Sequence, residues 1–531
     1  MKHFFSTISS IMLMASALCL SSCGDDSSDG DGGGGGGGGT TNIYVRSCSI
    51  TKGAEYKAGE LKEVTVSYNT VVAVSSNANI MLNATKCEAK ISATTAMDVI
   101  ITLPALEEGK AYTLTIPEGA IVGKNDASAK AKSYEINFTT KPGAQSYDND
   151  ATALTKKLGW GWNLGNHFDT SSGQDGKISM WGYWDNSTPT AALYTNLKAA
   201  GASTVRIPVT WGNYQQPTDP SWTIDADYMA LVKQNVEWAG AAGLNVILNI
   251  HHDEYWTDIK TAAINATKNA EIMDRIEKTW KQIAETFKDK GDFLFFETFN
   301  EVQDGNWGWG DNRTDGGKQY KTLNEWNQLV VNTIRATGSK NATRWIGVPG
   351  YASSPTFVLI DDFKLPTDAA NKIMVSVHFY DPSAFCLTPV KDGVTEWGHT
   401  AANGKYVIGS NEDHVVDVFQ QLQEKFIANN IPVYIGEYGC VLQTTYRSNL
   451  FRNYYLEYVC RAAHNYNLPV VIWDNWDGNT KGGGDERHYY INHNDGSFYT
   501  GMESLVNTMI KANTSDDKSY TLESIYNNAP Q

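Results

Sequence analysis

The fold of this chain is decided by the stretch Phe295-Phe296-Glu297-Thr298-Phe299-Asn300-Glu301. Its first half is an aromatic, apolar run typical of a buried strand, and its last residues are polar and lead into a turn-forming segment. The stretch Val433-Tyr434-Ile435-Gly436-Glu437-Tyr438-Gly439 has the same design further along the chain. Barrel enzymes built of alternating strands and helices carry their chemistry at such strand ends. Glu301 and Glu437 are therefore the candidate catalytic residues.

Eight strand-like segments alternate with amphipathic, helix-like segments from Ala151 onward. The predicted strands are 159–164, 204–208, 244–250, 293–299, 345–349, 373–379, 433–436 and 470–473. The clearest predicted helices are 189–200, 225–242, 270–290, 323–337, 413–429 and 446–465. Eight strands with helical crossovers predict an α/β fold, a (β/α)8 TIM-type barrel. A doubly wound sheet is the alternative, but Gly159-Trp160-Gly161-Trp162-Asn163 places bulky indoles where a phosphate-binding loop needs glycine.

Polar, ionisable or aromatic residues occupy nearly every carboxyl end of the predicted barrel strands. Besides the two glutamates, the set comprises Asn163, Arg206, His251, His252, Asn300, His378, Tyr380 and Trp473. One polar residue at such a position is usually structural, whereas a whole set at one end of a barrel indicates an active site. Acyl-transfer chemistry has little support, because no Ser or Cys stands beside a His and an acid in a strand-turn-helix context.

These strand ends resemble glycoside hydrolase family 5, the cellulase family, whose barrels carry two catalytic glutamates after strands four and seven. The matching motifs are Gly161-Trp162-Asn163-Leu164-Gly165-Asn166, Thr204-Val205-Arg206-Ile207-Pro208-Val209, Asn249-Ile250-His251-His252, Phe299-Asn300-Glu301, Val377-His378-Phe379-Tyr380, Ile435-Gly436-Glu437-Tyr438-Gly439 and Trp473-Asp474-Asn475. They follow the family's order and span nearly the whole second domain. One departure is Val302, where many relatives have proline.

The resemblance implies a role for each member of the set. Glu301 resembles the general acid/base and Glu437 the nucleophile. Arg206 and Tyr380 are implied to hold Glu437, and Asn300 is implied to bind the sugar 2-hydroxyl. His251 and His378 are implied to orient the acid/base and the sugar. Trp473 is implied to form the floor of the subsite that binds the reacting sugar. His252 is expected at the cleft wall.

Retaining hydrolysis of a β-glycosidic bond needs these residue types. A protonated carboxylic acid must reach the leaving oxygen, and an ionised carboxylate must lie beneath the anomeric carbon, about 5 to 5.5 Å from the acid. Arg206 beside Glu437 would favour its charged form. Partial desolvation near that anion would raise the pKa of Glu301, so that it stays protonated near neutral pH.

The resemblance implies a retaining endo-β-1,4-glucanase acting on cellulose-like or mixed-linkage β-glucan. A xyloglucan-specific endoglucanase and an endo-β-1,4-mannanase are alternatives on the same scaffold, and a non-catalytic surface glycan-binding protein is an alternative of another class. Tryptophans in the predicted post-strand loops suggest sugar-stacking platforms and an open cleft, although some must be core anchors. They are Trp181, Trp184, Trp211, Trp256, Trp307, Trp309, Trp397 and Trp476.

The first 22 residues have the pattern of a signal peptide, because a short apolar segment follows Lys2 and is too short to span a bilayer permanently. The sequence Leu20-Ser21-Ser22-Cys23 resembles a bacterial lipobox, which implies cleavage before Cys23 and its acylation. Residues 23–42 are acidic and then glycine-rich, and they predict a flexible tether. Acidic residues after the lipid-bearing cysteine also resemble an outer-membrane export signal, which implies a cell-surface location.

Residues 43–142 are predicted to form a small all-β sandwich, since short alternating runs are separated by Gly, Asn or Pro turns. This segment resembles bacterial immunoglobulin-like domains and contains no Trp, which favours a spacer over a glycan-binding module. Its Cys48 and Cys87 could pair or remain buried thiols. Pro142-Gly143 marks the expected boundary, and the catalytic domain is expected over 147–531.

The net charge of the chain and the spacing of its possible metal ligands limit the kinds of ligand that the protein is expected to bind. A net charge of -16 and a pI near 5.1 disfavour nucleic acid, which requires a basic face, and suit a neutral β-linked polysaccharide. The cysteines beyond the signal have no zinc-like spacing. Adjacent His251 and His252 could suggest a metal site, but residues on a strand alternate between faces, so hydrogen bonding is favoured over a shared ion. No metal or cofactor is expected.

Overall fold

The computed structural model describes residues 42–59, 61–171, 187–388, 393–475 and 486–531. The predicted signal peptide, Cys23 and nearly all of the tether lie outside this part of the chain. The chain divides into two compact units, with the boundary after Gly143.

The first unit is built of short, mostly antiparallel strands. They are β1 (Val45–Cys48), β2 (Glu55–Tyr56), β3 (Glu63–Tyr68), β4 (Val72–Val74), β5 (Met81–Leu82), β6 (Thr85–Lys86), β7 (Glu88–Ile91), β8 (Asp98–Thr102), β9 (Ala111–Ile116), β10 (Ile121–Gly123) and β11 (Tyr134–Thr140). One sheet has the order β1-β3-β8-β7, another the order β2-β11-β9-β5-β6, and β10 pairs with β4. Among the strands named for this unit, β2 and β11 are the pair that runs parallel. This unit is all-β, as predicted.

Alternation along β3 shows how the first unit builds its core. Every second residue of this strand is buried, namely Val64, Val66 and Tyr68. Cys87 lies in the same hydrophobic core and Cys48 packs against it. Both cysteines are free thiols, so the structure contains no bridge between them.

The second unit is a closed barrel of eight parallel strands, which confirms the predicted (β/α)8 fold. The strands are β12 (Gly161–Asn163), β13 (Thr204–Ile207), β14 (Asn245–Asn249), β15 (Leu294–Glu297), β16 (Ile346–Pro349), β17 (Ile373–Phe379), β18 (Val433–Tyr438) and β19 (Val470–Ile472). They pair in chain order, and β19 closes on β12. Their residues are buried almost throughout, as expected for strands covered on both faces.

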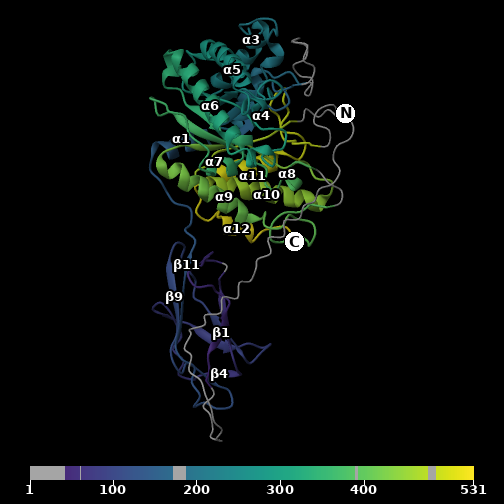
Figure 1. Cartoon of the computed structure of the whole chain (residues 1–531). Coiled ribbons are helices and arrows are strands. Elements are labelled where there is room, and N and C mark those ends of the chain that lie inside the picture. Colours follow the sequence, from purple (N-terminus) through teal and green to yellow (C-terminus); the bar gives the residue numbers. More distant parts are fainter. Residues whose placement is uncertain (1–41, 60, 172–186, 389–392, 476–485) are drawn as a thin grey trace. The chain divides into compact units, whose positions relative to one another are not determined.

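Helices form the outer layer of this unit (Figure 1). They are α1 (Asp150–Leu158), α2 (Ala191–Ala199), α3 (Ala226–Ala241), α4 (Ile259–Ala262), α5 (Ala266–Phe287), α6 (Lys318–Ala336), α7 (Pro355–Leu359), α8 (Ser383–Cys386), α9 (Glu412–Lys425), α10 (Tyr446–Asn465), α11 (Glu503–Thr514) and α12 (Leu522–Tyr526). Short 3-10 turns are η2 (Gly212–Tyr214), η3 (Asp311–Arg313), η4 (Ser339–Ala342), η5 (Tyr351–Ser353) and η6 (Ile427–Asn429). None of the described helices is long and apolar enough to span a membrane.

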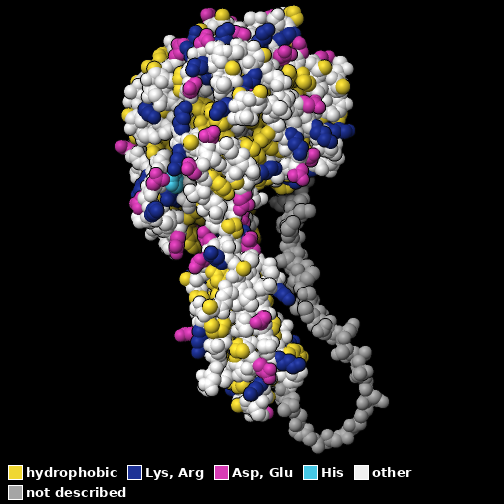
Figure 2. All heavy atoms as spheres, turned by 90° about the vertical axis from the view of Figure 1, so that its left-hand side faces the viewer, with side chains coloured by type: hydrophobic (Ala, Val, Ile, Leu, Met, Phe, Trp, Pro, Cys, Tyr) yellow, Lys and Arg dark blue, Asp and Glu magenta, His cyan; other side chains and the backbone are white. Residues whose placement is uncertain are grey.

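Helix α5 illustrates why these segments fold onto the barrel. Asn265 caps its first turn by accepting the Lys268 N–H at 3.1 Å. Ile276, Trp280 and Ile283 recur at helical spacing and are fully buried. The opposite face is charged. Over the face of the molecule in Figure 2, acidic and basic side chains are interspersed rather than gathered by sign.

Candidate active site

Arg206 lies at the centre of a buried charge cluster inside the barrel. Its guanidinium donates to both oxygens of Glu297, with Nε–Oε2 at 3.0 Å and Nη2–Oε1 at 2.7 Å, and its Nη1 donates to Oε1 of Glu437 at 2.7 Å. Glu297 also accepts the Tyr434 hydroxyl at 2.7 Å. Gly347 leaves room for that hydroxyl, since a Cβ there would collide with it. The two bonds to Glu297 thus fix the position of the Arg206 guanidinium, which also donates to Glu437.

Glu301 and Glu437 meet beside His378 at the carboxyl end of the barrel. Nδ1 of His378 lies 2.6 Å from Oε1 of Glu301 and 3.5 Å from Oε2 of Glu437. One oxygen of each glutamate and a ring nitrogen of His378 all lie within 4.8 Å of one another. Tyr380 donates its hydroxyl to Oε2 of Glu437 at 3.0 Å. The structure therefore brings together the two candidate catalytic residues and the groups expected to hold Glu437.

The two glutamates differ in their electrostatic surroundings. Burial raises the pKa of Glu301 to about 7, although the nearby His252 opposes the rise. Burial also raises the pKa of Glu437, but His378 and Arg206 oppose it there, and the arginine bond favours the carboxylate. Burial lowers the pKa of His378 to about 4, so its imidazole is neutral near pH 7. Glu301 thus keeps a proton to donate near neutrality, as a general acid must.

Glu301→Gln is expected to stabilise the protein at alkaline pH. Because the pKa of Glu301 is about 7 when folded and near that of a free glutamate when unfolded, the folded state binds the proton more tightly. Wild-type stability is therefore lost as pH rises through this interval, by about 3 kcal/mol in total. Denaturant unfolding should give equal stabilities near pH 4 and a more stable variant at pH 8. The exposed Glu424→Gln serves as control, and a pH-independent difference would contradict the assignment.

Asn300 and Asn163 both accept a hydrogen bond from Arg206, but their NH2 groups differ in what they can bind. Oδ1 of Asn300 accepts from Nη2 of the arginine at 2.7 Å, which leaves its NH2 group as the donor of this side chain. Asn163 is fully buried, its Oδ1 accepts from Nη1 at 3.0 Å, and its NH2 group donates to Gly436 O of β18 at 2.9 Å. The expected substrate contact of Asn163 is thus corrected, because its amide is used up in joining strands beneath the site.

His251 and His252 follow β14, and their rings lie 4.4 Å apart. The premise that they alternate between opposite faces is wrong, because β14 ends at Asn249 and strand alternation ends with it. His251 is buried, with its ring parallel to Trp473 at 5.8 Å, while the side chain of His252 is 30% exposed. Trp473 thus lies beside the site, and His252 lies at its solvent edge.

Two groups of side chains have the spacing of metal ligands. They are Asp169, His251 and His252, and Glu301, His378 and Glu437. In the first group, Oδ1 of Asn249 accepts the Val209 N–H at 3.1 Å, so its NH2 group donates to Nδ1 of His251 at 3.2 Å. Neutral His251 then carries its proton on Nε2 and offers no lone pair there. In the second, both oxygens of Glu437 are engaged by Arg206 and Tyr380. We assign no metal to either group.

Only part of the predicted aromatic platform is open to a ligand. Trp307 and Trp309, on the loop after β15, are 58% and 80% exposed. The buried members are Trp211, Trp256 and Trp397. Trp181, Trp184 and Trp476 lie outside the described residues. The buried tryptophans anchor loops, as Trp211 does by donating Nε1–H to Asn249 O at 2.8 Å.

Glu297 and Asp169 are the residues of the site that the sequence analysis did not single out. Glu297 is ionised inside the barrel, because Arg206 outweighs burial and holds its pKa below the usual value. The position of Glu297, an acidic residue inside an aromatic strand, was a signal in the sequence that it has a buried partner, since burying a charge without a partner is costly. Asp169 is fully buried, and Asn166 donates its N–H to Oδ2 at 3.0 Å. Nothing in its local sequence marks it.

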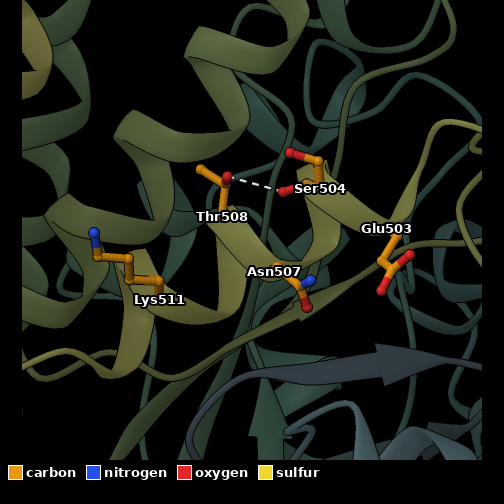
Figure 3. Close-up of a pocket in the computed structure, with 5 residues that line it drawn as sticks. All are labelled: Glu503, Ser504, Asn507, Thr508 and Lys511. Atoms are coloured by element: carbon orange, nitrogen blue, oxygen red, sulfur yellow. Dashed lines mark hydrogen bonds between the residues drawn. The ribbon is translucent and has the colours of Figure 1, made fainter.

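A separate hollow of about 400 Å³ lies on the surface of α11 (Figure 3). It is lined by Glu503, Ser504, Asn507, Thr508 and Lys511. Thr508 Oγ1 donates to Ser504 O within the helix at 2.9 Å. None of the strand-end residues lines it, so the chemistry of the protein is not located there.

The barrel and its buried carboxylate pair define the class of the protein. Glutamates whose oxygens approach within 4.8 Å, one bonded to arginine and the other with a pKa of about 7, form the pair of a retaining glycosidase. Residues 165–479 match the model of the cellulase family, glycosyl hydrolase family 5. The chain belongs to glycoside hydrolase family 5.

Individual relatives agree with this assignment. The chain is 34% identical to endoglucanase A of Paenibacillus barcinonensis over 340 residues, which are 61% of this chain and 82% of that protein. It is 34% identical to a xyloglucan-specific endo-β-1,4-glucanase of Bacteroides ovatus, over 62% of this chain and 65% of that protein. A solved broad-specificity endoglucanase from Bacteroides salanitronis is 40% identical, with a TM-score of 0.63 over 70% of this chain and 96% of its own.

Proposed function

We propose that the protein is a retaining endo-β-1,4-glucanase that cleaves internal bonds of cellulose-like or mixed-linkage β-glucan. The observation that carries the proposal is the approach of Glu301 and Glu437 within 4.8 Å, with Arg206 on the second. This spacing suits direct attack by a carboxylate, because an inverting enzyme needs a separation of about 6.5 to 9.5 Å to admit water.

In the first step, an oxygen of Glu437 attacks the anomeric carbon from the face opposite the leaving sugar. The bond from that carbon to the glycosidic oxygen breaks, and Glu301 delivers its proton to the oxygen. A glycosyl ester on Glu437 results. Tyr380 and Arg206 hold one oxygen each, which fixes the carboxylate for attack.

In the second step, Glu301 acts as a base. It takes a proton from a water molecule, whose oxygen attacks the anomeric carbon on the face that the first sugar left. The ester bond breaks and Glu437 leaves as a carboxylate. Because Arg206 bonds to Oδ1 of Asn300, the NH2 group of Asn300 is the part of this side chain that would hold the sugar 2-hydroxyl in both steps.

The exposed aromatic loop favours internal cleavage of long chains. Arg313 Nε donates to Gly308 O at 2.6 Å within this loop, and the exposed side chain of Asp311 pairs with Lys260 at 2.8 Å. The Arg313 guanidinium also lies 4.4 Å from the Trp309 ring. An exposed indole close to Glu301 in the chain offers a stacking face to a sugar beyond the cleavage point.

Trp309→Ala is expected to lower kcat/KM on barley β-glucan about five-fold, mainly through KM, because one stacking contact is worth about 1 kcal/mol. Hydrolysis of an aryl β-cellobioside, which is too short to reach the loop, should be unchanged. Tyr44→Ala, which removes another exposed aromatic in the first unit, is the control. An equal loss on both substrates would contradict a distal sugar contact.

Reducing-sugar release from a panel of polymers tests the proposal. Carboxymethylcellulose, barley β-glucan, xyloglucan and galactomannan should be compared, with Glu301→Gln and Glu437→Gln beside the wild type. Preference for either glucan supports the proposal, whereas preference for xyloglucan or galactomannan selects the xyloglucanase or mannanase alternative. Tight glycan binding without new reducing ends would favour the non-catalytic alternative.

We also propose that the protein is a lipoprotein, anchored through Cys23 in the outer membrane and facing outward. The lipobox-like Leu20-Ser21-Ser22-Cys23 and the acidic residues after it support this location. The antiparallel sheets of the first unit suit an immunoglobulin-like spacer.

Cys23→Ser is expected to abolish incorporation of labelled palmitate in bacterial cells that express the full chain. The lipid is attached through the Cys23 thiol, and no other thiol lies at the cleavage site. The enzyme should then move from the membrane to the soluble fraction with its hydrolytic rate intact. Cys48→Ser is the matched control, and persistent labelling of Cys23→Ser would rule out this anchor.

A further inference from the structure

The turn η5, which follows β16, binds the backbone on both sides of Glu301. Ser353 Oγ donates to the carbonyl oxygen of Asn300 at 2.6 Å, and the N–H of Ala352 donates to the carbonyl oxygen of Val302 at 2.9 Å. All four residues that make these two bonds are buried. The carbonyl groups directly before and directly after Glu301 are thus bound by two consecutive residues of one turn.

A third contact extends this connection along the chain after Glu301. The hydroxyl of Tyr351 accepts the Asp304 N–H at 2.8 Å and donates to Oε1 of Gln319 at 2.7 Å. Tyr351 is buried, and Gln319 is a buried residue of helix α6. The turn η5 therefore joins the segment that carries the acid/base to the outer helical layer of the barrel.

Two residues of this turn have a backbone conformation that is unfavourable for any residue with a Cβ. Ala352 and Ser353 have φ angles of 53° and 49°, in the left-handed region that non-glycine residues rarely adopt. Such strain persists only where the surrounding structure imposes it, and it is concentrated at functional sites. The two strained residues are the same two that bind the carbonyl groups beside Glu301.

Glu301 needs support from outside its own strand. Strand β15 ends at Glu297, so Glu301 lies four residues beyond the last residue of that strand. Its carboxyl group must nevertheless reach the glycosidic oxygen, and a misplacement of about 1 Å can lower a rate about 10²-fold. His378 contacts the end of the Glu301 side chain, whereas η5 holds the backbone that carries it. The end of β16 supplies none of the candidate catalytic residues and provides this support instead.

We propose that Ser353 is a positioning residue that directs the carboxyl group of Glu301 toward the glycosidic oxygen, because its hydroxyl holds the backbone that carries the acid/base. The proposal rests on the proposed retaining mechanism. Ser353 is fully buried and acts through the backbone of Asn300 and Glu301 rather than on the sugar. Ala352 and Tyr351 contribute to the same task with an N–H group and a hydroxyl.

Ser353→Ala is the first test, because it removes the hydroxyl and leaves the backbone of the turn under the same steric limits. Two substrates with the same sugar distinguish a misplaced acid from other defects. On phenyl β-cellobioside, whose leaving group needs a proton, kcat/KM should fall about ten-fold. On 2,4-dinitrophenyl β-cellobioside, whose leaving group departs without a proton, kcat/KM should change by less than about two-fold.

Thr204→Val is the matched control. The buried Oγ1 of Thr204 also donates to a backbone carbonyl, that of Leu158, at 2.6 Å, but Thr204 is the first residue of β13 and lies at the other end of the barrel. Both variants should lower the denaturation midpoint, whereas the ratio of the two rates should change in Ser353→Ala alone. Equal losses on the two substrates in Ser353→Ala, or the same change of ratio in Thr204→Val, would overturn the proposal.

A double-mutant cycle with Glu301→Gly tests whether Ser353 acts through the acid/base. Without the Glu301 side chain there is no carboxyl group to direct, so adding Ser353→Ala should leave kcat/KM on phenyl β-cellobioside unchanged. A further loss of about ten-fold in the double variant would show that Ser353 acts on another group, and the proposal would be wrong.

Tyr351→Phe provides the same test at a second position if Ser353→Ala does not fold. It removes the hydroxyl that binds the Asp304 N–H and keeps the ring. A preferential loss on phenyl β-cellobioside is again expected, and an unchanged ratio of the two rates would then overturn the proposal. A wild-type enzyme that cuts neither β-cellobioside nor barley β-glucan would instead overturn the proposed function.

Discussion

Glu437→Gly is expected to lower the rate of glucan hydrolysis by about 10⁵-fold or more, because no other group can form the covalent intermediate. The loss should not come from unfolding, since Glu437 lies at a strand end and its removal leaves Arg206 bonded to Glu297. Circular dichroism and the melting temperature should therefore stay close to those of the wild type.

Azide makes this prediction specific to the role of Glu437. The anion fits the space left by the side chain and attacks the anomeric carbon of an activated aryl β-cellobioside from the same face. The product should be the α-glycosyl azide, formed with one inversion. In Glu301→Gly the nucleophile is intact, so azide replaces water in the second step and the β-glycosyl azide should form. Proton NMR of the anomeric hydrogen distinguishes the two products.

Reversed stereochemistry would exchange the roles of Glu301 and Glu437. Absence of either azide product, with both variants folded, would contradict double displacement itself. Glu424→Gly, which removes an exposed carboxylate from α9, should hydrolyse β-glucan at the wild-type rate and yield no glycosyl azide.

Arg206→Met is expected to destabilise the enzyme by about 3 to 5 kcal/mol, because it strands the buried carboxylates of Glu297 and Glu437 without their cation. The pH dependence of the stability of the variant can show that the unpaired carboxylates are the cause. Without Arg206, burial dominates and raises the pKa of both acids in the folded state. The variant should therefore lose more stability as pH rises, so that its deficit is larger at pH 8 than at pH 4. Denaturant unfolding at both values measures it.

The same variant should lose about 10²- to 10³-fold in kcat, because the nucleophile loses its strongest fixed donor. Arg344→Met is a suitable control. Arg344 is also buried, but it donates to backbone carbonyls including Leu294 O and Lys290 O. It should cost stability without changing kcat of the folded enzyme. Equal losses of kcat in the two variants would show that Arg206 acts through stability alone.

The barrel could be predicted because its strands are buried on both faces and read as continuous apolar runs. The predicted strand 244–250 contains β14, and the predicted strand 373–379 coincides with β17. Boundaries set by polar caps were less visible, since α5 begins at Ala266 behind the cap Asn265 rather than at residue 270. The first residue of α5 is therefore set by the capping side chain and could not be predicted from hydrophobic periodicity.

The strand-end set could be predicted for the same geometrical reason, whereas contacts across the barrel could not. The carboxyl ends of parallel strands meet, so Glu301, His378 and Glu437 converge whatever the loops do. By contrast, Glu297 reaches Tyr434 across the interior, and Asn163 turns inward to join strands. Those partners depend on side-chain direction in the closed barrel, which no local pattern of residues records.

The bond of Arg206 to two carboxylates has a consequence for the reaction cycle. At rest, one guanidinium is shared by ionised Glu297 and Glu437, so this buried trio carries one excess negative charge. Once Glu437 becomes a glycosyl ester, only Glu297 balances the arginine and the trio becomes electroneutral. The resting nucleophile is thus the electrically unbalanced state and the covalent intermediate the balanced one. The charge balance inside the barrel thereby favours formation of the bond between Glu437 and the sugar.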